Sequence, residues 1–162
     1  MLPSYKYYPV ASGDADREIR VIYLEPSRNR DAPILCGLNN ISLDDYPEWK
    51  ADYTALSYTW DGQSPSCEVD CDAAIRELRH EEKTVKLWID SICINQSMDA
   101  IPERSHQVAI MGEIYKSVIK VVVWLGTSNV RVEAALNQLV DLFITTASPN
   151  LYIAAFNPAR RF

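Results

Sequence analysis

The 162-residue sequence lacks a long hydrophobic run, a secretory leader and a glycine-rich phosphate loop. Its longest apolar segments, such as Val121–Leu125, are far too short to span a bilayer. The N-terminus has no basic region followed by an apolar stretch, so we expect a cytoplasmic protein without a membrane partner. Neither G-x-G-x-x-G nor G-x4-G-K-[ST] occurs in the chain. The phosphate loops of Rossmann dehydrogenases and P-loop NTPases are therefore excluded.

Positive charge, histidine and cysteine are also scarce. The 16 Lys and Arg residues are outnumbered by 22 Asp and Glu, and a net charge of -6 argues against a nucleic-acid partner. Cys67 and Cys71 form a C-x3-C pair with no second pair and no His-x3-His partner, so we predict no metal site. Without a secretory leader, the four cysteines are interpreted as reduced thiols rather than as two disulfides.

The composition of the chain, with 48% hydrophobic and 23% charged residues, is that of a globular protein, and its length is that of one domain. We predict a β-rich N-terminal elaboration over 1–52, a core over 53–146, and a C-terminal extension or the start of a truncated region over 147–162. Apolar periodicity and turn residues predict strands at 17–25, 53–60, 86–90 and 120–126, and one short strand or a pair of strands at 33–38 and 40–43. They predict helices over about 73–82, with Asp72 as N-cap, from 99–102 onward, and over about 130–146.

The segment Lys120–Gly126 is apolar at almost every position, which is typical of a strand covered on both faces of a parallel sheet. We therefore predict that it is a central strand, flanked by the strands 53–60 and 86–90, with helices on both sides. One stripe of the second helix should pack on this sheet: Val108, Met111, Ile114, Tyr115 and Val118.

Ligands of parallel α/β sheets bind at the carboxyl ends of the strands, so the residues that follow each strand are candidates for a site. Carboxylates there could stabilise a cationic transition state, and aromatic and amide groups could hold a ribose or a base. The candidates are Ser57, Tyr58, Trp60 and Asp61 after one strand, Asp90, Cys93, Asn95 and Gln96 after the next, and Glu103 and Arg104 at the start of the second helix.

Several candidates have simpler interpretations. Trp60 could be core rather than a stacking surface, Asp90 could cap the turn that follows it, and Glu103 could favour the positive end of a helix. Cys93 could be a thiol nucleophile with His106 as its base, but its neighbours Ile92 and Ile94 favour a small buried side chain. Trp88 and Trp124 lie inside strands and are assigned to the core.

Four ordered blocks of the sequence resemble the fungal heterokaryon-incompatibility (HET) family. They are Tyr53–Trp60 (YTALSYTW), Leu87–Gln96 (LWIDSICINQ), Glu103–Tyr115 (ERxxQVxxMxxIY) and Val122–Gly126 (VVWLG). The resemblance implies a TIR-like (flavodoxin-like) three-layer α/β fold with a central, mainly parallel sheet. Two departures stand out: Asp61 is inserted between Trp60 and Gly62, and the connection from Trp60 to Leu87 is short for the family.

The same resemblance implies a role in regulated cell death during non-self recognition. TIR domains either cleave NAD at the nicotinamide–ribose bond or act as adaptors through self-association. For the first activity we expect Glu103 and Asp90 as catalytic acids, with Glu133 as the alternative acid from a strict TIR-like alignment. The substrate-binding residues would be Ser57, Tyr58, Trp60, Asp61, Asn95, Gln96 and Arg104, and NAD would be a substrate with no bound cofactor. The alternative is a non-catalytic module that forms a homo-oligomer or binds a nucleotide-binding receptor.

Overall fold

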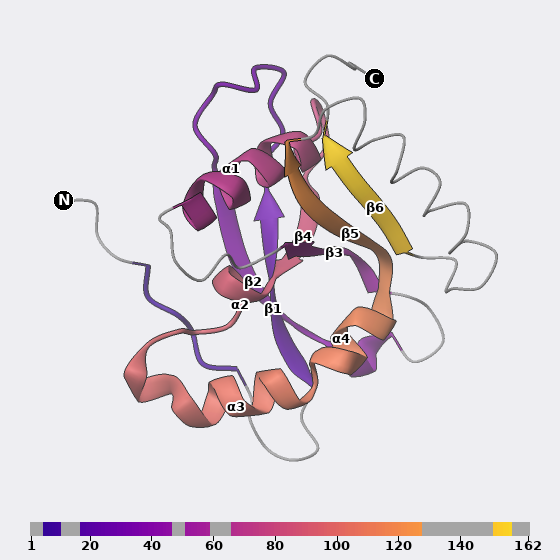
Figure 1. Cartoon of the computed structure of the whole chain (residues 1–162). Coiled ribbons are helices and arrows are strands. Elements are labelled where there is room, and N and C mark those ends of the chain that lie inside the picture. Colours follow the sequence, from indigo (N-terminus) through magenta and orange to yellow (C-terminus); the bar gives the residue numbers. More distant parts are fainter. Residues whose placement is uncertain (1–4, 11–16, 47–50, 59–65, 128–150, 157–162) are drawn as a thin grey trace.

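A computed structural model of the chain describes residues 5–10, 17–46, 51–58, 66–127 and 151–156. The strands are β1 (Glu18–Leu24), β2 (Cys36–Ser42), β3 (Ala51–Tyr58), β4 (Val85–Ile89), β5 (Val118–Thr127) and β6 (Leu151–Phe156). The helices are α1 (Ser66–Leu78), α2 (Asp90–Cys93), α3 (Ile101–Ala109) and α4 (Met111–Ser117), with short 3-10 turns η1 (Leu43–Asp45) and η2 (Met98–Ala100). All six strands form one sheet in the order β2-β1-β4-β3-β5-β6 (Figure 1).

The N-terminal strands belong to the same sheet as the core. β1 pairs antiparallel with β2 on one side, and on the other side with β4, where Ile22 lies opposite Leu87. The segments 33–38 and 40–43, predicted as one short strand or a pair of strands, form a single strand, β2, which includes the intervening residue Asn39. The predicted β-rich elaboration thus extends the sheet instead of forming a separate layer.

The remaining pairings are parallel, and they place β3 between β4 and β5. The prediction that 120–126 lies between 53–60 and 86–90 is wrong, because β5 pairs with β3 and β6. Its apolar character on both faces matches an interior position, but so does that of its neighbours. The α/β class is confirmed, and the sheet is mixed, with an antiparallel part at β2, β1 and β4.

The first helix begins earlier than the sequence predicts. α1 starts at Ser66, so Asp72 is an internal residue and not an N-cap; its carboxylate binds Arg76 one turn later at 2.7 Å. An i, i+4 ion pair of this kind is compatible with a helix interior, so the Asp72 side chain binds the next turn of the helix instead of capping its start. The helix predicted at 130–146 lies outside the described residues.

The predicted second helix is two helices that meet at Ile110. α3 begins next to Pro102 as expected, and its last turn closes with the Ile110 N–H donating to the carbonyls of His106 and Val108. α4 then buries Ile114, while Val108 is 54% exposed. The prediction that Val108 packs on the sheet is therefore wrong, because the break at Ile110 separates the inward face of α3 from that of α4.

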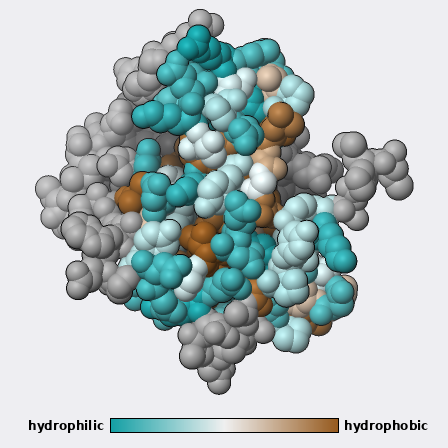
Figure 2. Space-filling model, turned by 180° about the vertical axis from the view of Figure 1, so that it is seen from behind, coloured by the Kyte–Doolittle hydropathy of each residue, from teal (hydrophilic) through white to brown (hydrophobic). Residues whose placement is uncertain are grey.

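The core lies on both faces of the central strands. Leu87, Trp88 and Ile89 are consecutive residues of β4 and all are fully buried, so the strand is covered on both sides. Trp88 stacks edge-to-face on Tyr115 of α4 at 5.4 Å, and Trp124 is also buried, which confirms both tryptophans as core residues. The surface seen in Figure 2 is mainly hydrophilic, with small apolar areas between polar side chains. None of the described helices is long and apolar enough to cross a membrane.

This packing predicts a large difference between two apolar residues that lie six positions apart. Truncating the fully buried Ile114 to Ala should lower the free energy of unfolding by about 2–5 kcal/mol, because it leaves a cavity between α4 and β5. Val108→Ala is the matched control and should change it by less than about 0.5 kcal/mol. Urea unfolding followed by fluorescence measures both; equal losses in the two variants would contradict the assignment of the break at Ile110.

Candidate functional site

The parallel part of the sheet has a switch point at β3. The chain passes from β3 through α1 to β4, which pairs with one side of β3, and then from β4 through α2, α3 and α4 to β5, which pairs with the other side. Crevices outside the carboxyl ends of the strands at such points are the usual ligand sites of open α/β sheets. The residues that end β3 and follow β4 are therefore the first to inspect.

Tyr58, Ser91 and Asp90 meet at this end of the sheet. Tyr58 closes β3, and its hydroxyl donates to Ser91 Oγ at 2.5 Å. Asp90 directly follows β4 as the first residue of α2, and its Oδ1 accepts from the Ser91 backbone N–H at 2.7 Å. Asp90 and Ser91 are both half-buried, so a carboxylate and two hydroxyls lie together at the carboxyl ends of two neighbouring parallel strands.

A second hydroxyl pair lies close to Asp90. The Tyr115 hydroxyl of α4 is hydrogen-bonded to Ser57, the penultimate residue of β3. Burial raises the pKa of Tyr115, and the negative charge of Asp90 raises it further, while the hydrogen bond with Ser57 lowers it. Tyr115 therefore stays protonated, and the rim presents neutral hydroxyls around the Asp90 carboxylate. We call Ser57, Tyr58, Asp90, Ser91 and Tyr115 the rim.

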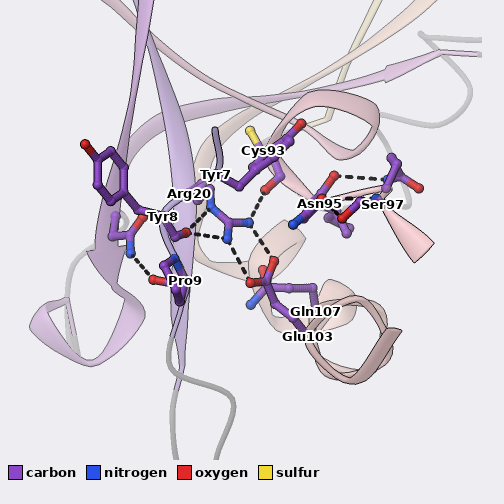
Figure 3. A network of polar contacts seen from close by, with 12 residues as sticks. Tyr7, Tyr8, Pro9, Arg20, Cys93, Asn95, Ser97, Glu103 and Gln107 are labelled. Carbon is purple, nitrogen blue, oxygen red and sulfur yellow. Dashed lines mark hydrogen bonds and ion pairs between the residues drawn. The ribbon is translucent and has the colours of Figure 1, made fainter. Parts of the chain in front are cut away.

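On the other side of α2 lies a buried ion pair (Figure 3). The Arg20 guanidinium of β1 is 1% exposed and binds both carboxylate oxygens of Glu103, with Nη1–Oε1 at 2.8 Å and Nη2–Oε2 at 2.9 Å. Nη1 also donates to the carbonyl of Cys93, and Nε and Nη2 donate to the carbonyl of Tyr8. The ion pair thus contacts the end of α2 through the Cys93 carbonyl, three residues after Asp90.

The inward face of α3 is polar because its side chains bind Arg20 and the backbone of β1. Glu103 and Gln107 are one turn apart, and Gln107 is 1% exposed with its Nε2 donating to the Glu18 carbonyl at 2.8 Å. The helix therefore docks on β1 through side-chain hydrogen bonds rather than through an apolar stripe. α4 continues with the apolar Ile114 in the equivalent place.

Comparison with known proteins assigns this arrangement to a family. The sequence model described as "Heterokaryon incompatibility protein (HET)" matches residues 53–147. The chain belongs to the HET family. It is 32% identical over 146 residues to "Heterokaryon incompatibility protein 6, OR allele" of Neurospora crassa, an alignment that covers 75% of this chain and 21% of that protein. The chain thus spans about a fifth of that relative. No solved structure matches the chain.

The HET blocks contain most of the predicted site, but the structure separates their residues. Ser57, Tyr58 and Asp90 gather at the rim, whereas Asn95 and Gln96 bind their own loop, with Asn95 Oδ1 accepting from Ser97 and Gln96 Nε2 donating to the Ile94 carbonyl. Arg104 is half-buried on α3, next to Glu103. The predicted Trp60, Asp61 and Glu133 lie outside the described residues.

Cys93 of the HET block LWIDSICINQ is not an available nucleophile. It is fully buried, its Sγ lies 3.4 Å from the Ile89 backbone N–H, and burial raises the pKa of its thiol to about 12. A thiolate is the reactive form, so a cysteine-dependent mechanism is disfavoured.

In the described part of the chain, no group of three His, Cys, Asp or Glu side chains could hold a metal ion.

Arg20 is the residue that the sequence analysis missed. It lies in the apolar segment Glu18–Leu24, and the period of two places it on the same face as the buried Ile22 and Leu24. A charged residue on the apolar face of a strand requires a buried partner, and that was the available signal. The partner, Glu103, is 83 positions away and could not be assigned by spacing.

We expect Cys93→Ala to lower the stability of the chain near neutral pH by about 1 kcal/mol, through loss of packing. The cost should shrink as the pH rises. The thiol pKa is about 12 in the folded chain and about 8.5 in an unfolded one, so the wild type loses stability progressively above pH ~8.5. The variant lacks this loss.

Urea unfolding of wild type and Cys93→Ala at pH 7 and pH 10 measures the effect. The difference in their free energies of unfolding should shift by about 1–2 kcal/mol in favour of the variant between the two pH values. Cys36→Ala is the comparison: that cysteine is exposed and burial raises the pKa of its thiol less than that of Cys93, so its gap from the wild type should change in the same direction by a smaller amount. A gap that stays constant with pH would contradict the assignment of a buried, neutral Cys93 thiol.

Proposed function

We propose that this HET domain is an effector of fungal regulated cell death in non-self recognition, and that it acts by hydrolysing NAD at the nicotinamide–ribose bond. The name of the Neurospora crassa relative supports the biological role. The observation that carries the chemistry is the rim, where Asp90 lies among the hydroxyls of Tyr58, Ser91, Ser57 and Tyr115 beside a topological switch point.

The strand order supports a relation to TIR-like folds. If the parallel strands β3, β4, β5 and β6 are renumbered from one to four, their order in the sheet is 2-1-3-4. This is the beginning of the flavodoxin-like order 2-1-3-4-5. The antiparallel β1 and β2 are then additions beside β4, which is strand 2 of the flavodoxin-like order and would otherwise be the edge of the sheet.

The reaction needs one carboxylate and ordered hydroxyls. The C1′–N1 bond of the nicotinamide ribose breaks, its electron pair moves to the pyridine nitrogen, and a water oxygen binds C1′ and loses a proton, giving ADP-ribose, nicotinamide and H⁺. Asp90 would stabilise the oxocarbenium-like centre or orient a ribose hydroxyl. The rim hydroxyls would bind the ribose. Substrate contacts by Trp60, Asp61 and Arg104 stay predictions, as do those by Asn95 and Gln96, which bind their own loop in the structure.

The geometry favours Asp90 over Glu103 for contact with the substrate. Both oxygens of Glu103 are bound to Arg20, and its side chain is only 15% exposed. Asp90 Oδ1 accepts from its own turn at Ser91, and the residue is half-buried. Glu133 stays a prediction as an alternative acid.

The test is NAD turnover by the purified chain at high concentration or with a crowding agent, with nicotinamide release as the readout. Asp90→Asn should lower kcat by about 10²–10³-fold, because it removes the charge while keeping the shape. Asp52→Asn is the matched control; Asp52 lies near the start of β3, at the opposite end of the sheet, and binds Lys86. It should retain wild-type turnover.

The alternative is a non-catalytic module that signals by assembly with itself or with a receptor. One observation favours it: Glu103, the acid of the matched HET block, is held in a buried ion pair. If the wild type releases no nicotinamide even under crowding, and Asp90→Asn still kills cells on overexpression, assembly carries the signal. If Asp90→Asn loses both NAD turnover and cell killing, the result would support the enzymatic function.

A further inference from the structure

Arg20 uses every donor of its side chain inside the protein. A guanidinium has five N–H groups, and five hydrogen bonds are formed: two to Glu103, two to the Tyr8 carbonyl and one to the Cys93 carbonyl, at 2.6–3.0 Å. The planar fork of arginine matches a carboxylate in a way that lysine cannot. Figure 3 shows the guanidinium between the N-terminal segment, the end of α2 and α3.

These bonds join three parts of the chain that are far apart in sequence. Tyr8 is 12 positions from Arg20, Cys93 is 73 and Glu103 is 83. The N-terminal segment 5–10 is fixed further by the Tyr7 hydroxyl, which donates to the Ile92 carbonyl at 2.9 Å. The Tyr7 ring also lies 5.0 Å from the Arg20 guanidinium carbon, at cation–π distance.

These contacts meet at α2, the single turn that bears the rim acid. It runs from Asp90 to Cys93, and its C-terminal end closes with the Ile94 N–H donating to the Asp90 carbonyl at 3.0 Å. Its last two carbonyls, of Ile92 and Cys93, accept from Tyr7 and Arg20. At its start, Ser91 is bound to Tyr58. A four-residue helix is not stable alone, so these outside contacts fix its position.

We propose that Arg20 and Glu103 form a positioning pair, in which Glu103 orients the Arg20 fork and Arg20 fixes the Cys93 carbonyl, so that Asp90 and Ser91 are held at the rim. The inference rests on the proposed function, because it concerns the geometry of the same rim. It gives Glu103 a role other than that of catalytic acid, since neither of its oxygens is free of Arg20.

The first experiment compares Arg20→Lys and Glu103→Gln with the wild type by hydrogen exchange and NAD turnover. Both should raise the exchange rate of the amides of residues 91–95 by at least about tenfold, while the amides of β3 and β4 keep their protection. NAD turnover should fall by a similar factor in both single variants. Because the two residues act as one unit, turnover of the double variant should be no lower than that of the less active single variant.

The matched control is a second Arg–Glu ion pair near the same end of β1. Arg17 Nε lies 2.9 Å from Glu113 Oε2, and both side chains are substantially exposed. Arg17→Lys and Glu113→Gln carry the same chemical changes, and they should leave the exchange of residues 91–95 and the turnover unchanged. Exposed ion pairs contribute little to structure.

A second experiment separates positioning from stability. Replacing both members together, Arg20→Met with Glu103→Met, removes two buried charges and keeps the side-chain volume; such exchanges are often neutral for stability. The folded protein should then show fast exchange at 91–95 and lowered turnover, with an unfolding midpoint near that of the wild type. If this variant does not fold, Tyr7→Phe removes only the bond to the Ile92 carbonyl and should raise exchange at 91–95 by a smaller factor.

Two results would overturn the inference. One is unchanged exchange at 91–95 in Glu103→Gln and Tyr7→Phe. The other is a Glu103→Gln protein that loses turnover while Arg20→Lys keeps it, which would make Glu103 the catalytic acid. If the wild type itself releases no nicotinamide, the proposed hydrolysis fails; the exchange measurements still decide whether Arg20 and Glu103 position α2.

Discussion

One buried arginine fixes how several elements dock on the sheet. Taking a guanidinium out of water is costly, and the cost is offset only where a carboxylate and several carbonyls meet it in good geometry. Arg20 satisfies this with Glu103, Tyr8 and Cys93. Because these partners come from the N-terminal segment, α2 and α3, a single side chain specifies how three elements dock on β1. Gln107 adds a further hydrogen bond from α3 to the same strand.

This arrangement links the N-terminal strands to the candidate site. The matched HET region begins at residue 53, yet the residue that anchors the turn after β4 lies in β1. β1 pairs with β4 along the whole of its second half, so the start of β1 extends past the carboxyl end of β4 and reaches α2. A side chain from before residue 53 thus binds the turn that begins with Asp90.

Local features of the structure could be predicted from the sequence, whereas the partnerships between distant residues could not. The apolar segment 120–126 identified β5, and Pro102 identified the start of α3. The order of strands depends on which edges meet in space, and no periodicity records that β3 separates β4 from β5. The break at Ile110 could not be predicted because Val108 and Ile114 fit one helical stripe as well as two.

For the candidate site, the rule that ligands bind after the ends of parallel strands placed Asp90 correctly at the carboxyl end of β4. Glu103 fits a catalytic acid by spacing, but its ion pair with Arg20 is visible only in three dimensions.

The composition of β2 has a consequence for self-association. β2 is the outer strand of the sheet, and its sequence CGLNNIS contains a glycine, two asparagines and a serine, which are poor strand formers. Most of its side chains are exposed, and none of the described strands pairs with its outer side. Such an edge is a weak template for strand addition by another chain, a common route to unwanted fibrils. Along this edge the chain is thus protected from pairing with other chains into fibrils.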